Sequence, residues 1–127
     1  MFFIGYNKTT MIPFNNRFHG HSSLNYVYRN GQVIRSRFAT LKFSPNTKRS
    51  KSRLAVVVGK KVIKSAVARN RIRRRAYEYL RLKMPEFSQN YDLIIIVSSS
   101  ELMTMPADEF ANQMDQLMNQ AKLYKTT

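Results

Sequence analysis

Near its middle the sequence reads Arg53-Leu54-Ala55-Val56-Val57-Val58-Gly59, an apolar run between a cation and a glycine. A short run of this kind predicts a β-strand, and its unbroken Ala-Val series predicts burial on both faces of a sheet. A second run, Tyr91-Asp92-Leu93-Ile94-Ile95-Ile96-Val97, predicts a central strand. We therefore expect a sheet around which the other elements pack.

The segment between these two strands predicts the main helix. Residues 65–84 contain no Gly or Pro, and Pro85 closes the segment. Apolar side chains recur within it at positions i, i+4, i+7 and i+8, which is the spacing of one buried helix face. The members of this stripe are Ile72, Ala76, Tyr79 and Leu80.

On the N-terminal side, the sequence predicts a short helix followed by a strand. Ser22 and Ser23 offer N-cap hydroxyls and Gly31 supplies a C-terminal stop, which predicts a helix over residues 22–30. Residues 33–43 alternate in a way that predicts one strand.

Two further elements are predicted, a loop between the first two strands and a last helix at the C-terminal end. Residues 44–52 indicate a hairpin-like loop, and Thr104 is expected to cap a helix with Pro106 in its first turn. The apolar stripe of that helix is Phe110, Met114, Leu117, Met118 and Ala121. The element order predicts one domain, an α+β sandwich whose sheet is covered largely on one side and leaves a face for a ligand.

The charge is distributed very unevenly along the chain. Residues 1–77 hold eighteen of the 22 Lys and Arg residues and no Asp or Glu, so the formal charge is +18 before Glu78 and −3 from there on. A chain that excludes negative charge over this length is typical of a protein that binds a polyanion. Nucleic acid is the expected partner.

The cations are densest at the start of the main helix. Six of them lie between Lys64 and Arg75 without a carboxylate. At 100° per residue, Asn70 and the arginines at 71, 73 and 74 project away from the apolar stripe, whereas Arg69 has to reach sideways. Arginine favours bidentate phosphate contacts and stacking on bases. The alternative interpretation is a solvated basic face or a localisation tag.

Few residues are candidates for chemistry in the protein itself. The absence of Cys excludes disulfides and thiolate metal sites. His19 and His21 are better interpreted as polar tail residues than as metal ligands. No pair of acids has catalytic spacing. The aromatic side chains at 18, 28 and 38 are candidates either for base contact or for the core.

No apolar run is long enough to span a membrane and Met1–Gly5 does not resemble a signal peptide, so we expect a cytoplasmic protein.

The basic segment resembles the protein subunit of bacterial ribonuclease P. That family has a strand ending in a Gly/Ser-Lys-Lys turn, followed by Ala-Val-x-Arg-Asn-Arg-x-Lys/Arg-Arg on a helix. Here Gly59-Lys60-Lys61 and Ala66-Val67-Ala68-Arg69-Asn70-Arg71-Ile72-Arg73-Arg74 match in order and spacing. The resemblance covers residues 17–124, with 1–16 as a weakly ordered extension and 125–127 as a tail.

The resemblance implies an α-β-β-β-α-β-α sandwich with a mixed sheet and a left-handed βαβ crossover, which is the uncommon hand. It also implies a subunit, one copy per RNA, that binds ribonuclease P RNA and the 5′ leader of precursor tRNA. The RNA, with Mg²⁺ bound mainly by it, removes the leader, so no catalytic residue is expected on this chain. Two rivals stay open from composition alone, namely a structural ribosomal protein and a DNA-binding architectural module.

The resemblance also implies two sets of site residues. The residues implied to bind the catalytic RNA are Lys60, Lys61, Lys64, Arg69, Asn70, Arg71, Arg73 and Arg74. The residues implied for the leader cleft are Arg17, Phe18, Leu24, Tyr28, Phe38 and Lys42. The family usually has aromatic residues at the positions of Leu24, Tyr28 and Lys42, of which only Tyr28 is aromatic here. Arg75 stands where the family more often has an apolar residue.

Overall fold

Strand pairing builds one mixed sheet with the order β1-β2-β4-β3. The computed structural model describes residues 16–18 and 22–125. Its elements in chain order are α1 (Ser22–Asn30), β1 (Gln32–Arg35), β2 (Ala39–Pro45), β3 (Arg53–Val58), α2 (Ala66–Lys83), the 3-10 turn η3 (Met84–Glu86), β4 (Tyr91–Val97), α3 (Glu101–Thr104) and α4 (Ala107–Ala121). Apart from the short η3 and α3, this is the α-β-β-β-α-β-α order, and the predicted fold class is confirmed.

β4 is the central strand, as its Ile-rich run predicts. It pairs antiparallel with β2 and parallel with β3, with Leu54 opposite Leu93. α2 connects the two parallel strands and so forms the expected crossover, whose hand stays a prediction. The expectation that the Ala-Val run is buried on both faces is wrong. β3 lies at the edge of the sheet, where Ala55 and Val57 are only half-buried.

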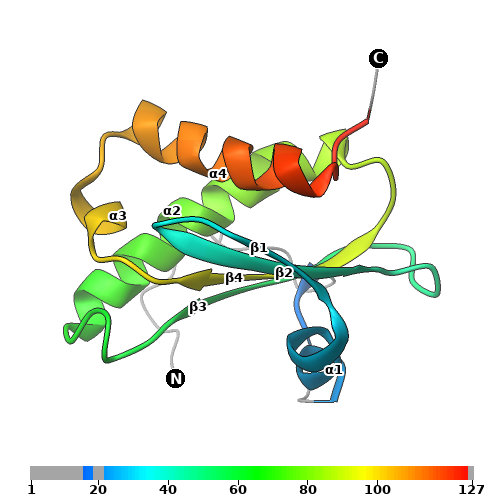
Figure 1. Cartoon of the computed structure of the whole chain (residues 1–127), viewed down its shortest axis with the longest axis horizontal. Helices are drawn as coiled ribbons and strands as arrows, with labels where there is room; N and C mark the ends of the chain where they lie inside the picture. Colours follow the sequence, from blue (N-terminus) through cyan, green and yellow to red (C-terminus); the bar gives the residue numbers. More distant parts are fainter. Residues whose placement is uncertain (1–15, 19–21, 126–127) are drawn as a thin grey trace.

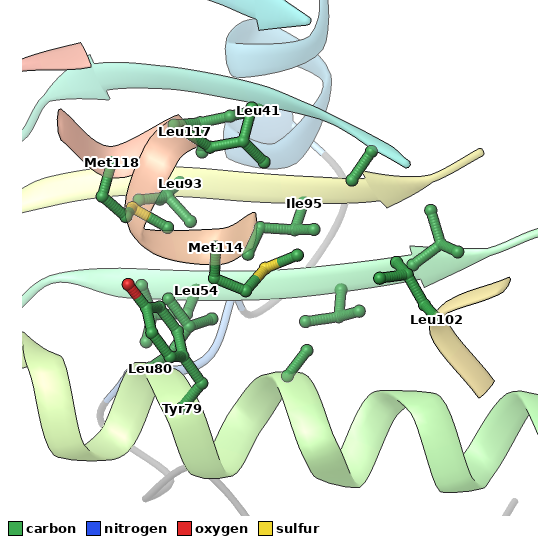
Figure 2. Packing of buried hydrophobic residues seen from close by; sticks show 14 of the residues in the cluster. Leu41, Leu54, Tyr79, Leu80, Leu93, Ile95, Leu102, Met114, Leu117 and Met118 are labelled. Atoms are coloured by element: carbon green, nitrogen blue, oxygen red, sulfur yellow. The ribbon is translucent and has the colours of Figure 1, made fainter. Parts of the chain in front are cut away.

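The two faces of the sheet are covered by different helices (Figure 1). α2 and α4 lie over one face and α1 lies against the other. Alternation along the strands sends Leu41, Leu54 and Leu93 into the main hydrophobic core (Figure 2). The helices contribute Ile72, Ala76, Tyr79 and Leu80 from α2, and Phe110, Met114, Leu117 and Met118 from α4. Both predicted stripes are confirmed except at Ala121, which is half-buried.

On the opposite face, α1 covers only part of the sheet. Val27 of α1 and Ile94 of β4 are fully buried there. Thr40, Ile96 and Val57, which lie side by side across β2, β4 and β3, are only half-buried. The part of this face that α1 leaves uncovered is the surface available to a ligand.

Local signals define two helix boundaries as the sequence predicts. α1 ends at Asn30, and the next position accepts only glycine: a Cβ atom on Gly31 would lie 2.6 Å from the Val27 carbonyl oxygen and 3.0 Å from that of Phe43. α2 begins after Ser65, whose Oγ accepts a hydrogen bond from the Ala68 amide at 3.2 Å. This bond satisfies one of the amides that a helix N-terminus leaves without an intrahelical partner.

The single strand predicted over residues 33–43 is wrong, because β1 and β2 form a hairpin there. The Ser36 amide donates to the Ala39 carbonyl at 2.9 Å. The Ser36 Oγ accepts from the amides of Phe38 at 3.3 Å and Ala39 at 3.2 Å. One serine side chain therefore supports a tight turn in a segment without Gly, Asn or Pro, the residues that most often announce a turn.

The predicted start of the last helix is also wrong. Thr104 is the last residue of α3, and Pro106 occupies the N-cap position of α4. Asp108 and Glu109 do lie in the first turn of α4, where their charges suit the positive end of the helix dipole. The short helix α3 was not predicted because only four residues form it.

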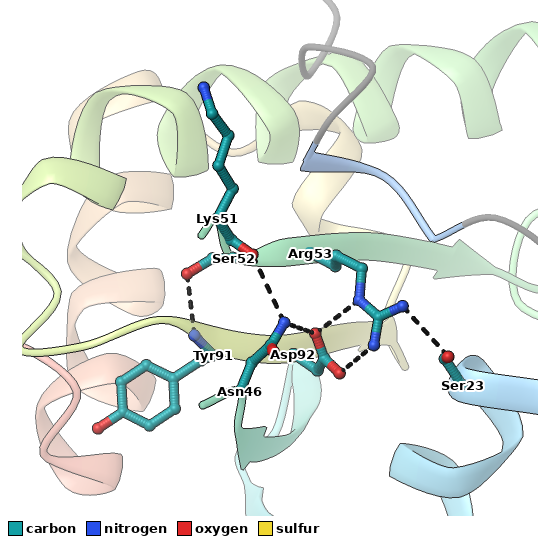
Figure 3. A network of polar contacts seen from close by, with 7 residues as sticks. All are labelled: Ser23, Asn46, Lys51, Ser52, Arg53, Tyr91 and Asp92. Carbon is teal, nitrogen blue, oxygen red and sulfur yellow. Dashed lines mark hydrogen bonds and ion pairs between the residues drawn. The ribbon is translucent and has the colours of Figure 1, made fainter. Parts of the chain in front are cut away.

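A buried ion pair joins α1 to the sheet (Figure 3). Arg53 of β3 donates from Nε and Nη2 to the two carboxylate oxygens of Asp92 on β4, at 2.9 and 2.6 Å. Its Nη1 donates to the Ser23 Oγ of α1 at 3.1 Å. Asn46 Nδ2 donates to Asp92 Oδ1 at 2.7 Å. Because both charged side chains are almost withdrawn from water, these additional bonds are needed to offset their desolvation.

We predict that Asp92→Ala lowers the free energy of unfolding by about 3–5 kcal/mol, because it leaves the Arg53 charge buried without its partner. Urea denaturation measures this change. The double variant Arg53→Met with Asp92→Leu should recover most of the loss. Glu101→Ala, which breaks the exposed ion pair with Arg37, serves as the control. Equal losses for Asp92→Ala and Glu101→Ala would contradict a structural role for the buried pair.

Candidate nucleic-acid interface

The start of α2 and the turn before it form a basic surface. The Gly59 carbonyl accepts hydrogen bonds from the amides of Val62 and Ile63, at 3.2 and 3.1 Å. Ile63 is buried and anchors the turn in the hydrophobic core. The exposed cations on this turn are Lys60, Lys61 and Lys64. This turn, which we call the lysine turn, therefore presents ammonium groups to solvent from a fixed backbone.

Arg69 braces this turn from inside. Its Nη1 donates to the carbonyl oxygens of Ile63 at 3.0 Å and Lys64 at 2.8 Å. The side chain is half-buried, in agreement with its predicted position beside the apolar stripe. Arg69 thus reaches sideways to the protein's own backbone and holds the turn against the helix.

Asn70 orients a neighbouring arginine. Its Oδ1 accepts a hydrogen bond from Arg73 Nη1 at 2.7 Å, one helical turn further along. Arg71 and Arg74 are exposed, whereas Arg73 is half-buried. The side-chain amide, which a purely electrostatic patch does not require, therefore restricts the direction of one guanidinium. Together these residues project from the outer side of α2, as predicted.

No carboxylate neutralises this surface within the described residues. The ion pairs found among the described residues join Arg37 to Glu101, Arg53 to Asp92, Arg81 to Glu78, and Lys83 to Glu86 and Asp115. None of these pairs includes a cation of the turn or of the first turns of α2. The cations at that end consequently repel one another in the free protein, and a polyanion would relieve the repulsion.

Arg75 belongs to the interior and not to this surface. Its Nη1 donates to the Leu102 carbonyl oxygen at 2.7 Å, and its guanidinium carbon lies 4.6 Å from the centre of the Phe110 ring. Burial lowers the pKa of Arg75 from its ordinary value. Arg75 therefore donates hydrogen bonds to the backbone of α3, while the apolar stripe of α2 stays buried.

A second group of candidates lies beside α1. Lys42 of β2 extends its ammonium group to the Tyr28 carbonyl oxygen at 3.0 Å and lies 4.6 Å from the centre of the Tyr28 ring. The lysine thereby covers one side of the ring. Tyr28 remains 36% exposed, and this pair borders the uncovered part of the sheet.

Arg17 and Phe18 lie at the other border of that face, along β3. Arg17 forms an isolated parallel bridge with Leu54, which extends the edge of the sheet by one residue. The Arg53 guanidinium carbon lies 5.1 Å from the centre of the Phe18 ring. The buried ion pair therefore also supports an aromatic ring at the sheet edge.

The other two cleft candidates have different surroundings. Leu24 is half-buried on α1. Phe38 lies in the β1–β2 turn and packs against the main hydrophobic core, with the Arg37 guanidinium 5.1 Å from its ring centre. Sequence reasoning missed Tyr26, which is 60% exposed on α1. The available signal was its place outside the apolar spacing of Leu24 and Val27.

The described residues offer little for metal or membrane binding. None of them forms a group of three or more His, Cys, Asp or Glu suited to hold a metal ion. His19 and His21 lie outside the described residues. Among the helices of the described part, none combines the length and apolarity needed to cross a membrane.

Comparison with known proteins gives consistent matches. The profile of the family described as Ribonuclease P matches residues 12–122. The chain is 32% identical over 120 residues to the ribonuclease P protein component of Synechococcus sp. (strain JA-2-3B'a(2-13)), covering 92% of this chain and 90% of that one. It is 37% identical over 100 residues to that of Carboxydothermus hydrogenoformans, covering 78% and 82%. Its fold is similar to the RNase P proteins of Staphylococcus aureus (TM-score 0.76, 22% identity, covering 87% and 98%) and Thermotoga maritima (TM-score 0.70, 20% identity, covering 81% and 96%).

We predict that two arginines of the same helix differ sharply in their effect on stability. Arg69→Ala should lower the free energy of unfolding by about 1–2 kcal/mol, because two backbone carbonyls lose a charged donor. Arg71→Ala should change it by less than about 0.5 kcal/mol, as exposed substitutions usually do. Urea denaturation measures both, and amide exchange over residues 60–65 should accelerate only in Arg69→Ala. Equal protection of these amides in both variants would contradict the bracing role.

Proposed function

Because this chain belongs to the ribonuclease P protein family, we propose that it is the protein subunit that binds the catalytic RNA and the 5′ leader of precursor tRNA. In this role it assists removal of the leader and formation of the mature tRNA 5′ end. The observation that carries the proposal is the exposed cation cluster at the start of α2, which no carboxylate neutralises in the described residues. An RNA backbone supplies that negative charge.

The catalytic RNA docks on the outer side of α2 in this proposal. Arg71 and Arg74 are exposed there and can each form bidentate contacts with phosphate oxygens. Arg73 is held in direction by Asn70, and the lysine turn is held by Arg69. Because Arg73 and the backbone of the lysine turn are already ordered by internal hydrogen bonds, their binding has less conformational entropy to overcome.

The single-stranded leader follows the part of the sheet that α1 does not cover. Lys42 occupies one side of the Tyr28 ring, so Tyr28 has its other side free for one base. Where the family usually has an aromatic residue, Lys42 supplies a positive charge for a leader phosphate. Phe18, supported by Arg53, borders the same face and is a second candidate for stacking. Stacking of a base on an aromatic ring contributes about 1–3 kcal/mol.

Phosphodiester hydrolysis is assigned to the RNA. In this proposal Mg²⁺ is bound mainly by RNA oxygens, because Mg²⁺ keeps several waters and is held largely through phosphate oxygens in such sites. This chain then has no catalytic residue. It acts as the accessory subunit of an endoribonuclease, one copy per RNA, and increases the affinity for substrate through the contacts described above.

Reconstitution tests this function. Adding the chain to a bacterial ribonuclease P RNA at low Mg²⁺ should restore 5′ processing of precursor tRNA.

The affinity for that RNA should fall steeply with salt, because binding releases counterions. Replacing Arg71 and Arg74 together by Ala should lower the slope of log affinity against log salt by about two. Fluorescence or filter-binding titrations at several salt concentrations measure the slope.

Lys125→Ala provides the matched control for this experiment. Lys125 is an exposed cation near the other end of α2, beside the bridge between Phe87 and Tyr124. Its removal should leave the salt slope unchanged. A slope that stays the same in the Arg71 and Arg74 variant would exclude α2 from the interface, and failure to restore processing would contradict the function itself.

We also predict that Tyr28→Ala raises KM for precursor tRNA with a leader by about tenfold, the effect of losing one base stack. Leaderless substrate should be affected little, and Tyr28→Phe should behave as the wild type. Steady-state cleavage and competition binding with both substrates measure the difference. Equal losses for the two substrates would mean that Tyr28 acts on the fold of α1 instead of the leader.

A further inference from the structure

An open pocket of about 580 Å³ lies between α1 and the β2–β3 loop, away from the Tyr28 and Lys42 pair. This volume is in the range of small-ligand sites, about 300–1,000 Å³. Its lining includes Tyr26 of α1, Lys48 and Arg49 of the loop, and the buried pair Arg53 and Asp92.

The pocket is distinct from the proposed leader path. Tyr26 and Tyr28 are two residues apart on a helix, so their side chains leave α1 about 200° apart. Tyr28 contacts Lys42 on β2, whereas Tyr26 lines the pocket together with Ser44, two residues further along the same strand. A base stacked on Tyr28 therefore does not itself occupy the pocket beside Tyr26.

The loop that forms one wall is tied to β4 and the residues before it. The Asn46 amide donates to the Asn90 carbonyl oxygen at 2.9 Å, and Asn90 Nδ2 donates to the Arg49 carbonyl oxygen at 3.0 Å. The Asn46 side chain donates to Asp92 at 2.7 Å and to the Lys51 carbonyl oxygen at 3.5 Å. Figure 3 shows the two bonds of the Asn46 side chain. Together these bonds hold the loop backbone, and the side chains of Lys48 and Arg49 project from a fixed support.

The charge in the pocket is positive. Asp92 is engaged by both arms of Arg53 and by Asn46, so its negative charge is already balanced. Lys48 and Arg49 are exposed and form no ion pair within the described part of the chain. Tyr26, 60% exposed, adds an aromatic surface at the same opening. An anion alone would not need that ring.

We propose that this pocket binds one nucleotide of a single-stranded RNA segment. The base stacks on Tyr26, and the adjoining phosphates contact Lys48 and Arg49. This inference rests on the proposed function, because it takes RNA as the partner. The segment belongs either to the precursor tRNA leader or to the catalytic RNA, and the two sources present the same chemistry to the pocket.

The experiment compares pocket variants in two assays. One assay measures the affinity of the chain for ribonuclease P RNA alone. The other measures the affinity of the assembled enzyme for precursor tRNA with and without a leader. Tyr26→Ala should weaken binding in one assay by roughly tenfold, whereas Tyr26→Phe keeps the ring and should match the wild type. Lys48→Ala with Arg49→Ala should lower the salt slope in the same assay by about 1.4, the value for two contacts to a single strand.

Every outcome assigns or rejects the site. A loss confined to RNA alone identifies the catalytic RNA as the source, and a loss confined to substrate with a leader identifies the leader. Equal losses for RNA alone and for substrates with and without a leader mean that Tyr26 acts on the fold of α1, and they overturn the inference. Unchanged affinity in both assays for the Tyr26 and the loop variants overturns the inference. If Tyr26→Ala unfolds α1, as thermal unfolding would reveal, the variant in the exposed loop decides alone. Lys125→Ala, which removes one exposed cation elsewhere, is its control. The Arg71 and Arg74 variant is measured in parallel: an effect there without one in the pocket rejects only this inference, and no effect in either excludes both surfaces from the interface. The proposed function itself is rejected by failure to restore processing.

Discussion

The bidentate ion pair between Arg53 and Asp92 fixes the position of α1 on the sheet. It joins β3 to β4 inside the sheet, and the third donor of the same guanidinium reaches Ser23 of α1. Withdrawing two charges from water is costly, so every donor and acceptor around them must be used. α1 is consequently held across one end of the sheet, and the uncovered sheet face and the pocket beside Tyr26 lie on its two sides.

Arginines of the same sequence segment serve opposite purposes. Arg69 and Arg75 donate to backbone carbonyls and hold the lysine turn and the end of α3, respectively. Arg71 and Arg74 remain exposed to solvent. A net charge of +15 therefore overstates the charge that is available to a polyanion, because part of it is engaged in internal contacts. The internal arginines still serve binding indirectly, since they fix the backbone from which the exposed cations project.

The two basic surfaces flank the ends of one strand. The β2–β3 loop precedes β3 and the lysine turn follows it, so the six residues of β3, about 20 Å in length, separate them. Figure 1 shows the loop and the start of α2 at opposite ends of the molecule. A rigid sheet between the two basic surfaces sets their spacing, and an RNA that reached both would gain from the second contact without further translational cost.

The sequence by itself determined the elements whose signal is local. The Ile-rich central strand, the stripe of α2 from Ile72 to Leu80 and the Gly31 stop follow from spacing and residue type, and the charge division indicated the class of partner. Only the tertiary structure decided the β1–β2 hairpin, where a serine side chain builds the turn. It also decided which guanidinium groups face solvent and that Tyr26 lines one pocket with the loop cations. Those outcomes depend on carbonyls and carboxylates brought close by chain segments far apart in sequence, and periodicity carries no information about such partners.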